Sequence, residues 1–127
     1  EKLSKNYEVI ETVEYSEMPK HFSDADIVVA RAGANTVSEI AIAGRPSVLI
    51  PIPWSYQNEQ LENARRLEEV GGAFILDQES ATPEKLLVLL QKAISNWSAM
   101  ANSLEKVRDT DTQAANRLVG LMEESLA

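Results

Sequence analysis

The sequence predicts an α/β fold in which a parallel sheet is flanked by helices. Short apolar runs alternate along the chain with segments of helical periodicity, and Gly or Pro residues separate most of them. Strands that alternate with helices form parallel sheets, since a parallel pair needs a long crossover connection. With 127 residues and a hydrophobic content of 44%, the chain has the size of one ordinary domain, which we assign to residues 1–127.

The first part of the chain is expected to contain two strands and two helical segments. Residues 7–13 alternate and are rich in β-branched residues, which predicts a strand, and residues 18–23 predict a short helix or turn. Residues 27–30 form a continuous apolar run, which is typical of a strand covered on both faces. Residues 36–43 have helical spacing, and Gly44 follows at the position where a left-handed residue ends a helix.

The middle of the chain continues the alternation. Buried strands are predicted at residues 47–51 and 73–76, and a polar helix at residues 57–70 between them. Ligands of parallel sheets bind beyond the carboxyl ends of the strands. Because the turn at residues 31–35 directly follows a predicted strand, it is expected to lie on that edge.

The last part of the chain is expected to be helical. Thr82 is the predicted N-cap of a helix that has Pro83 at its first position. The residues expected to line one face of this helix are Leu86, Leu87, Leu90 and Ile94. A further helix is predicted from residue 98 to residue 126, with a break near residues 109–111.

Composition and charge exclude several classes of function. The net charge of -8 argues against binding to nucleic acid, because no excess of basic residues is present to neutralise phosphates. The chain has no Cys and only one His, His21, so the sequence predicts no disulfide, no metal site and no cofactor. Its apolar stretches are too short for a transmembrane segment. These features fit a reducing, cytosolic compartment.

The run ARAGANTVSE at residues 30–39 places a Gly between two Ala residues ahead of a predicted helix. The free N–H groups of a helix start suit an anionic phosphate, and Gly33 lets the backbone approach a ligand closely. Two interpretations are open. Thr36 and Glu39 have the spacing of a capping box, which needs no ligand. Alternatively, the Glu39 carboxylate accepts hydrogen bonds from the hydroxyls of a ribose.

Other polar and aromatic positions also have two interpretations each. Gln60 either binds sugar hydroxyls or belongs to a solvated helix face, and Arg31 either faces a phosphate or pairs with Asp26. Trp54 and Tyr56 either close over a ligand or pack their own loop. The sequence contains no recognisable set of catalytic residues, so no catalytic residue is assigned to this chain.

Two runs of sequence resemble a known family. They are ADIVVARAGANTVSEIAIAGRPSVLIPIP and NEQLENARRLEEVGGAFIL, and with the residues before them they cover most of residues 7–77. They resemble the donor-binding half of the MurG family of bacterial peptidoglycan glycosyltransferases, which transfer GlcNAc from UDP-GlcNAc to lipid-linked muramoyl-pentapeptide. The resemblance implies an inverting, metal-independent enzyme. It also implies a Rossmann-like domain, the C-terminal half of a GT-B glycosyltransferase, that lacks its first strands.

The resemblance further implies a donor site for UDP-GlcNAc. Its expected residues are Tyr15, Met18, Arg31, Gly33, Ala34, Asn35, Thr36, Glu39 and Gln60. In this assignment the diphosphate lies against residues 34–36, Glu39 holds the ribose, and Gln60 binds the GlcNAc hydroxyls. The backbone at Tyr15 contacts the uracil edge, and Met18 lies near it.

The family also implies partners outside this chain. Its members bind the lipid-linked acceptor through an N-terminal domain, as peripheral proteins at the cytoplasmic face of the bacterial membrane. The chain is therefore expected to be a C-terminal fragment or a separate donor-binding subunit. The sequence departs from the family at Glu14, where an aromatic residue is usual, and at Glu59, where His is common. Two alternatives stay open: a UDP-sugar-binding module without activity, and a relative of the UDP-GlcNAc 2-epimerases.

Overall fold

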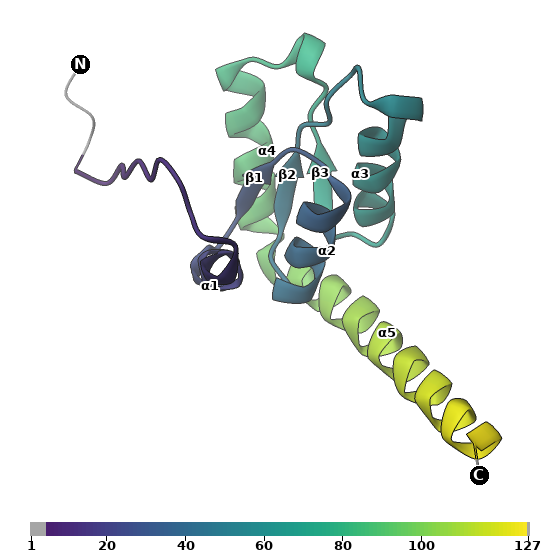
Figure 1. Ribbon diagram of the computed structural model, residues 1–127. Coiled ribbons are helices and arrows are strands. Elements are labelled where there is room, and N and C mark those ends of the chain that lie inside the picture. Colours follow the sequence, from purple (N-terminus) through teal and green to yellow (C-terminus); the bar gives the residue numbers. More distant parts are fainter. Residues whose placement is uncertain (1–4, 127) are drawn as a thin grey trace.

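The computed structural model describes residues 5–126, except for the side chains of residues 110–112, and contains a three-stranded parallel sheet (Figure 1). Its strands are β1 (Val28–Ala30), β2 (Ser47–Leu49) and β3 (Ala73–Ile75). The strand order is β1-β2-β3, and Val48 of the central strand lies between Val29 and Phe74. The predicted class, a parallel sheet flanked by helices, is confirmed.

Helices cover both faces of this sheet (Figure 1). The α-helices are α1 (Met18–Asp24), α2 (Ala34–Ala43), α3 (Glu59–Glu69), α4 (Pro83–Ser95) and α5 (Trp97–Leu126). Short 3-10 helices are η1 (Tyr15–Glu17), η2 (Tyr56–Asn58) and η3 (Gln78–Ser80). The two crossover helices α2 and α3 share one face, as right-handed connections require, and α4 crosses the other face. The first turns of α5 pack against α2 and α4, and the rest extends away from the sheet.

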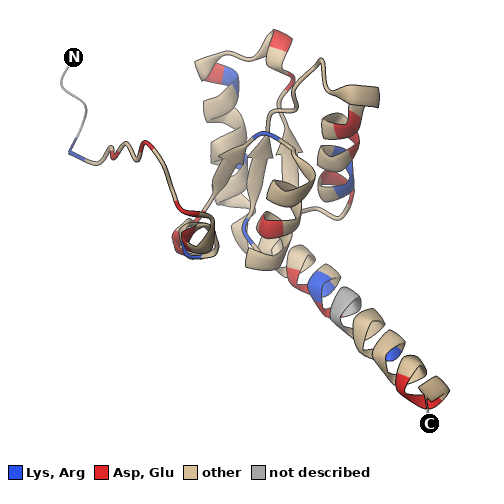
Figure 2. Cartoon of the chain, viewed as in Figure 1, with Lys and Arg blue, Asp and Glu red and all other residues tan. Residues whose placement is uncertain are grey.

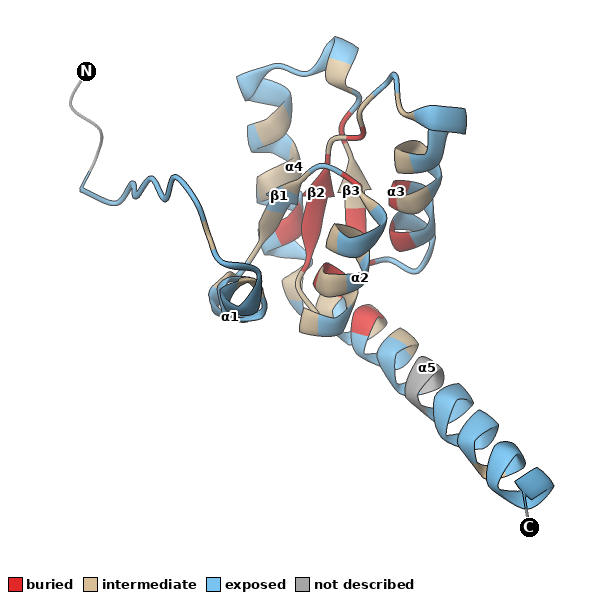
Figure 3. Ribbon diagram, viewed as in Figure 1, coloured by how far each residue is buried: buried red, intermediate tan, exposed pale blue. Residues whose placement is uncertain are grey.

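The core lies around the central strand. All three residues of β2 are buried, which explains why apolar residues follow one another from Val48 to Ile50 instead of alternating with polar ones. Ile40 from α2, Leu67 from α3 and Leu104 from α5 complete the core. Figure 3 shows the buried positions gathered on the sheet and on the inward sides of the helices, whereas the N-terminal segment and the outer part of α5 are exposed.

Two helix ends, the start of α4 and the end of α2, agree with the sequence. Thr82 caps α4, since its Oγ1 accepts a hydrogen bond from the Lys85 N–H at 3.2 Å. Gly44 follows α2 with φ of 67°, a left-handed conformation that glycine adopts without steric cost. None of the helices in residues 5–126 is long and apolar enough to span a membrane.

The strand predicted at residues 7–13 is wrong. This segment has no regular secondary structure and is largely exposed; Tyr7, Val9 and Ile10 are all more than a third exposed to solvent. An alternating pattern forms a strand only where a neighbouring strand supplies hydrogen bonds, and no described strand pairs with this segment.

Two expectations for the C-terminal helices are also corrected. Leu86 and Leu90 of α4 are half-buried as predicted, but Leu87 and Ile94 are 54% and 64% exposed. The small residue Ala93 is fully buried instead, which lets the helix approach the sheet closely. The break predicted near residues 109–111 is absent, because the backbone of α5 is helical throughout.

Candidate functional site

The candidate site lies at the edge of the sheet where β1 and β2 end. The last link of the ladder there is the hydrogen bond from the Ile50 N–H to the Ala30 carbonyl, at 2.9 Å. Residues 31–33 then lead into α2, and residues 50–55 lead towards α3. Because parallel strands place their carboxyl ends on one edge, both loops leave the sheet together.

Helix α2 begins at Ala34, so its N-cap lies three residues before Thr36, the N-cap that the capping-box spacing predicts. Gly33 is the N-cap, and its carbonyl accepts the Val37 N–H at 3.0 Å. No side chain caps the helix, and Thr36 lies inside the first turn. The capping-box interpretation of Thr36 and Glu39 is therefore wrong, because neither residue stands at the position that a capping box requires.

The backbone donors at the start of α2 are open. The N–H groups of residues 34–36 have no hydrogen-bond partner within the described part of the chain. Gly33 has an ordinary extended conformation with φ of -62°, and a Cβ built on it would meet only Thr36 Oγ1, at 3.9 Å. Neither conformation nor packing requires glycine there. The missing side chain instead leaves open space beside three unpartnered donors, which carry the positive end of the helix dipole.

Two side chains of α3 hold the loop that precedes these donors. Gln60 Oε1 accepts hydrogen bonds from the N–H groups of Ala32, at 3.3 Å, and Ile52, at 3.0 Å. Asn63 Nδ2 donates to the Ala32 carbonyl at 3.1 Å. Neither predicted interpretation of Gln60 included this role. Only the Gln60 oxygen is used for it, and the Nε2 group has no hydrogen-bond partner among the described residues. Asn63 was not predicted at all; its position three residues after Gln60 puts it on the same helix face.

Arg31 also serves the loop. Its Nη1 donates to the Ile50 carbonyl at 3.1 Å, so the guanidinium links the loop after β1 to the loop after β2. The predicted ion pair with Asp26 is not found among the described residues. The guanidinium has further N–H groups, and the assignment of Arg31 to a phosphate stays a prediction.

A pocket of about 280 Å³ lies between α1 and α2. It is lined by Tyr15, Pro19, Ser23, Glu39, Ile42 and Ala43. Tyr15 and Glu39 thus line the same pocket. The predicted contacts of Tyr15 with uracil and of Glu39 with ribose require these two residues to lie close together. Met18 does not line this pocket, because its side chain packs against the hydrophobic core. Trp54 and Tyr56 are 73% and 79% exposed, so neither packs its own loop.

Charged side chains contribute little to the site. The hydrogen bond between Lys20 and Asp24 on α1 raises the pKa of Lys20 and lowers the pKa of Asp24, but both groups are exposed. Figure 2 shows Lys and Arg interspersed with Asp and Glu rather than gathered on one face. The described residues contain no group of three or more acidic or His side chains that could hold a metal ion. The positive groups at this edge are therefore the open N–H groups at the start of α2 and the guanidinium of Arg31.

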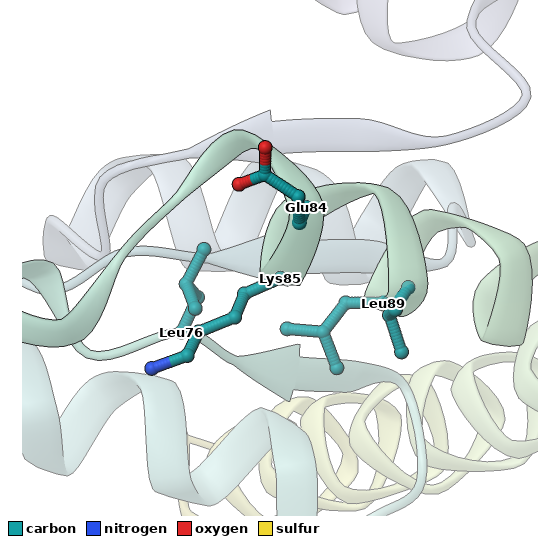
Figure 4. A pocket seen from close by; sticks show the side chains of 5 residues that line it. Leu76, Glu84, Lys85 and Leu89 are labelled. Carbon is teal, nitrogen blue, oxygen red and sulfur yellow. The ribbon is translucent and has the colours of Figure 1, made fainter.

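A second pocket, of about 360 Å³, lies beside α4 and is separate from this site. Figure 4 shows its lining side chains, which include Leu76, Glu84, Lys85 and Leu89. None of the predicted donor-site residues contributes to it. Three of its five lining residues are apolar, namely Leu76, Val88 and Leu89.

Comparison with known proteins identifies the family. The model of the glycosyltransferase family 28 C-terminal domain matches residues 1–118. The chain belongs to this family. The glycosyltransferase family expected from the ARAGANTVSE run and its surroundings is confirmed.

Two family 28 relatives are proteins of Sinorhizobium medicae and Rhizobium meliloti, 34% and 35% identical over 113 residues. Both are named UDP-N-acetylglucosamine--N-acetylmuramyl-(pentapeptide) pyrophosphoryl-undecaprenol N-acetylglucosamine transferase. The alignments cover 89% of this chain and 30% of each relative. The chain therefore spans less than a third of the length of these relatives.

Solved structures agree with the family 28 assignment. MurG of Acinetobacter baumannii matches with a TM-score of 0.70 and 35% identity, over 78% of this chain and 30% of that one. The glycotransferase of kitacinnamycin matches with a TM-score of 0.61 and 27% identity, over 69% of this chain and 22% of that one. The parallel sheet with its helices is thus the C-terminal domain of a GT-B glycosyltransferase.

Proposed function

We propose that this chain supplies the donor site of an enzyme that transfers GlcNAc from UDP-GlcNAc to lipid-linked muramoyl-pentapeptide, converting lipid I to lipid II. The names of the relatives support this reaction. The observation that carries the proposal is the start of α2, where three unpartnered N–H groups adjoin a glycine that the fold does not need. Such a helix start binds phosphate groups, and UDP-GlcNAc brings a diphosphate.

The proposed chemistry follows from those donors. As the bond between the anomeric carbon and the diphosphate oxygen breaks, negative charge develops on the UDP leaving group. N–H groups of residues 34–36 stabilise this charge by fixed hydrogen bonds and by the helix dipole, with no need for a metal ion. An acceptor hydroxyl attacks the opposite side of the anomeric carbon and gives its proton to a general base outside this chain, and the attack inverts the configuration.

The remaining donor-site residues have the binding roles that the family resemblance implies. Glu39 holds the ribose hydroxyls and the backbone at Tyr15 reads the uracil edge, a proposal supported by their shared pocket. Gln60 offers its Nε2 group to the GlcNAc hydroxyls while its oxygen holds the two loops. The lipid-linked acceptor binds to another domain of the whole enzyme, which works as a peripheral protein at the cytoplasmic face of the bacterial membrane.

Titration of the chain with UDP, followed by NMR of the backbone amides, tests this proposal. We expect the largest shifts at residues 34–36, with further shifts at Glu39 and around Tyr15. UMP, which lacks the second phosphate, serves as the control and is expected to shift residues 34–36 less. Shifts confined to α4 and α5 would contradict the proposed site.

Glu39→Gln is expected to weaken UDP binding by about 1–3 kcal/mol, the usual contribution of a hydrogen bond to a charged group. Stability should change by less than about 0.5 kcal/mol, because the Glu39 side chain makes no described hydrogen bond and caps no helix. Calorimetric titration and denaturant unfolding measure the two effects. Glu68→Gln is the matched control, because Glu68 is an exposed residue of α3. If Glu39→Gln binds UDP with unchanged affinity, Glu39 does not hold the ribose.

Gly33→Ser is expected to stabilise the fold slightly while weakening UDP binding. The extended backbone of Gly33 is the normal conformation of an N-cap, and a Ser hydroxyl there bonds the N–H of the second or third helical residue. The gain in stability should be a few tenths of a kcal/mol. The same hydroxyl competes with the diphosphate, so affinity should fall by about 1–2 kcal/mol. Gly33→Ser with wild-type affinity for UDP would show that the diphosphate binds elsewhere.

A further inference from the structure

The backbone N–H and the backbone carbonyl of Ala32 are both held by side chains of one helix, α3. Ala32 is completely buried, and the sheet ladder has already ended at Ala30. Its N–H donates to Gln60 Oε1 and its carbonyl accepts from Asn63 Nδ2, at 3.3 and 3.1 Å. Side chains of α3 thus replace the strand partners that this buried peptide lacks.

This arrangement directly precedes the start of α2. Gly33, the N-cap, directly follows Ala32, and the three open N–H groups follow Gly33. A shift or rotation of the Ala32 peptide would therefore change the direction of all three donors. Because a hydrogen bond weakens steeply as its angle departs from linear, the strength of anion binding depends on this peptide.

The backbone at the start of α3 has an unusual conformation just before the two amide side chains, Gln60 and Asn63. Gln57 and Asn58, just before the helix, both have left-handed φ values, of 50° and 57°. The Gln60 N–H then donates to Ser55 Oγ at 3.2 Å, and Gln60 Oε1 also binds the Ile52 N–H. The left-handed pair carries a conformational cost that the contacts around Gln60 offset.

We propose that Asn63 is a positioning residue for the diphosphate site: with Gln60 it fixes the Ala32 peptide and so aims the N–H groups of residues 34–36. This inference rests on the proposed function for its ligand. In this role Asn63 affects the diphosphate through the backbone of Ala32 and Gly33.

Asn63→Asp tests the inference, because it keeps the shape of the side chain and replaces the donor with a carboxylate that repels the Ala32 carbonyl. We expect the Kd for UDP to rise about tenfold, the scale for losing one hydrogen bond and adding a repulsion. Asn63→Ala, which removes the donor without repulsion, should raise it about fivefold. Calorimetric titration gives both values.

Asn96→Asp is the matched control. Asn96 Nδ2 also donates to a backbone carbonyl, that of Lys92 at 2.8 Å, but at the far end of α4. We expect this control to lose stability while its Kd for UDP stays within about twofold of the wild type, which is near the precision of such titrations. Asn63 variants that remain folded and also stay within twofold would overturn the positioning role.

A ligand-free measurement separates this inference from the proposed function. In Asn63→Asp without UDP, the amide resonances of residues 33–37 should move, whereas those of α5 should not. If wild-type protein binds no UDP, the proposed function fails, and unchanged resonances at residues 33–37 would then overturn the positioning role as well. Unfolding free energies of each variant show whether its fold is intact.

Discussion

The 127-residue chain by itself is expected to bind UDP and to transfer no sugar to a lipid-linked muramoyl acceptor. Transfer needs the acceptor hydroxyl held against the anomeric carbon, with a general base within about 3 Å of that hydroxyl. Holding two reactants together contributes about 7–11 kcal/mol to lowering a barrier. The candidate site provides groups for the donor only, and the chain spans 30% of its curated relatives.

A transfer assay with radiolabelled UDP-GlcNAc measures this directly. The chain is assayed alone and together with the part of a relative that lies outside the match, supplied as a second polypeptide. Turnover is expected only in the mixture, and Glu39→Gln in the mixture should reduce it. Turnover by the chain alone would contradict the assignment of a donor half. UDP binding without turnover in a correctly folded mixture would favour a binding module.

Gly72→Ala is expected to destabilise the chain by about 2–3 kcal/mol, near the upper part of the range for overpacked cores. A Cβ at Gly72 would lie 2.3 Å from Leu104 Cδ2 and 2.7 Å from Leu104 Cγ. Leu104 is fully buried in the core, so its side chain has no free space into which it can move. The contact between the loop before β3 and α5 therefore has to open. Denaturant unfolding monitored by circular dichroism gives the change in free energy.

Gly120→Ala is the control for this prediction. A Cβ at Gly120 meets nothing within 4 Å, and the residue lies inside α5, so the change should stabilise by about 0.5–1 kcal/mol through helix propensity. The double variant Gly72→Ala with Leu104→Ala should be less destabilised than the sum of the single variants, since the added methyl fills part of the cavity. Additive effects would mean that Leu104 does not exclude the methyl group.

Periodicity was sufficient to predict the parallel sheet because its three strands and two crossover helices are each marked within their own few residues. Residues 48–51 are apolar throughout, and the strand found there, Ser47–Leu49, is buried on both faces. The segment at residues 7–13 has an equally good pattern but no partner strand among the described residues. A local pattern predicts which face a strand would bury. It does not predict whether the strand forms, because strand pairing depends on residues far away in the sequence.

The start of α2 could not be predicted from its own sequence. Thr36 and Glu39 have capping-box spacing, yet the helix begins at Ala34. The backbone just before the helix is held by residues 28 and 31 positions further along, Gln60 and Asn63, which a local sequence pattern does not reveal. Glu39 and Tyr15 were selected through the family resemblance, and their common pocket depends on how α1 packs against α2.

A binding site built from main-chain N–H groups has a consequence for its evolution. The side chains of Ala34 and Asn35 are exposed and make no described hydrogen bonds, so their replacement leaves the phosphate donors in place. Among the standard amino acids, only proline removes a backbone N–H. Substitutions at Ala34 and Asn35 can therefore change the side chains beside the proposed diphosphate site without removing its donors.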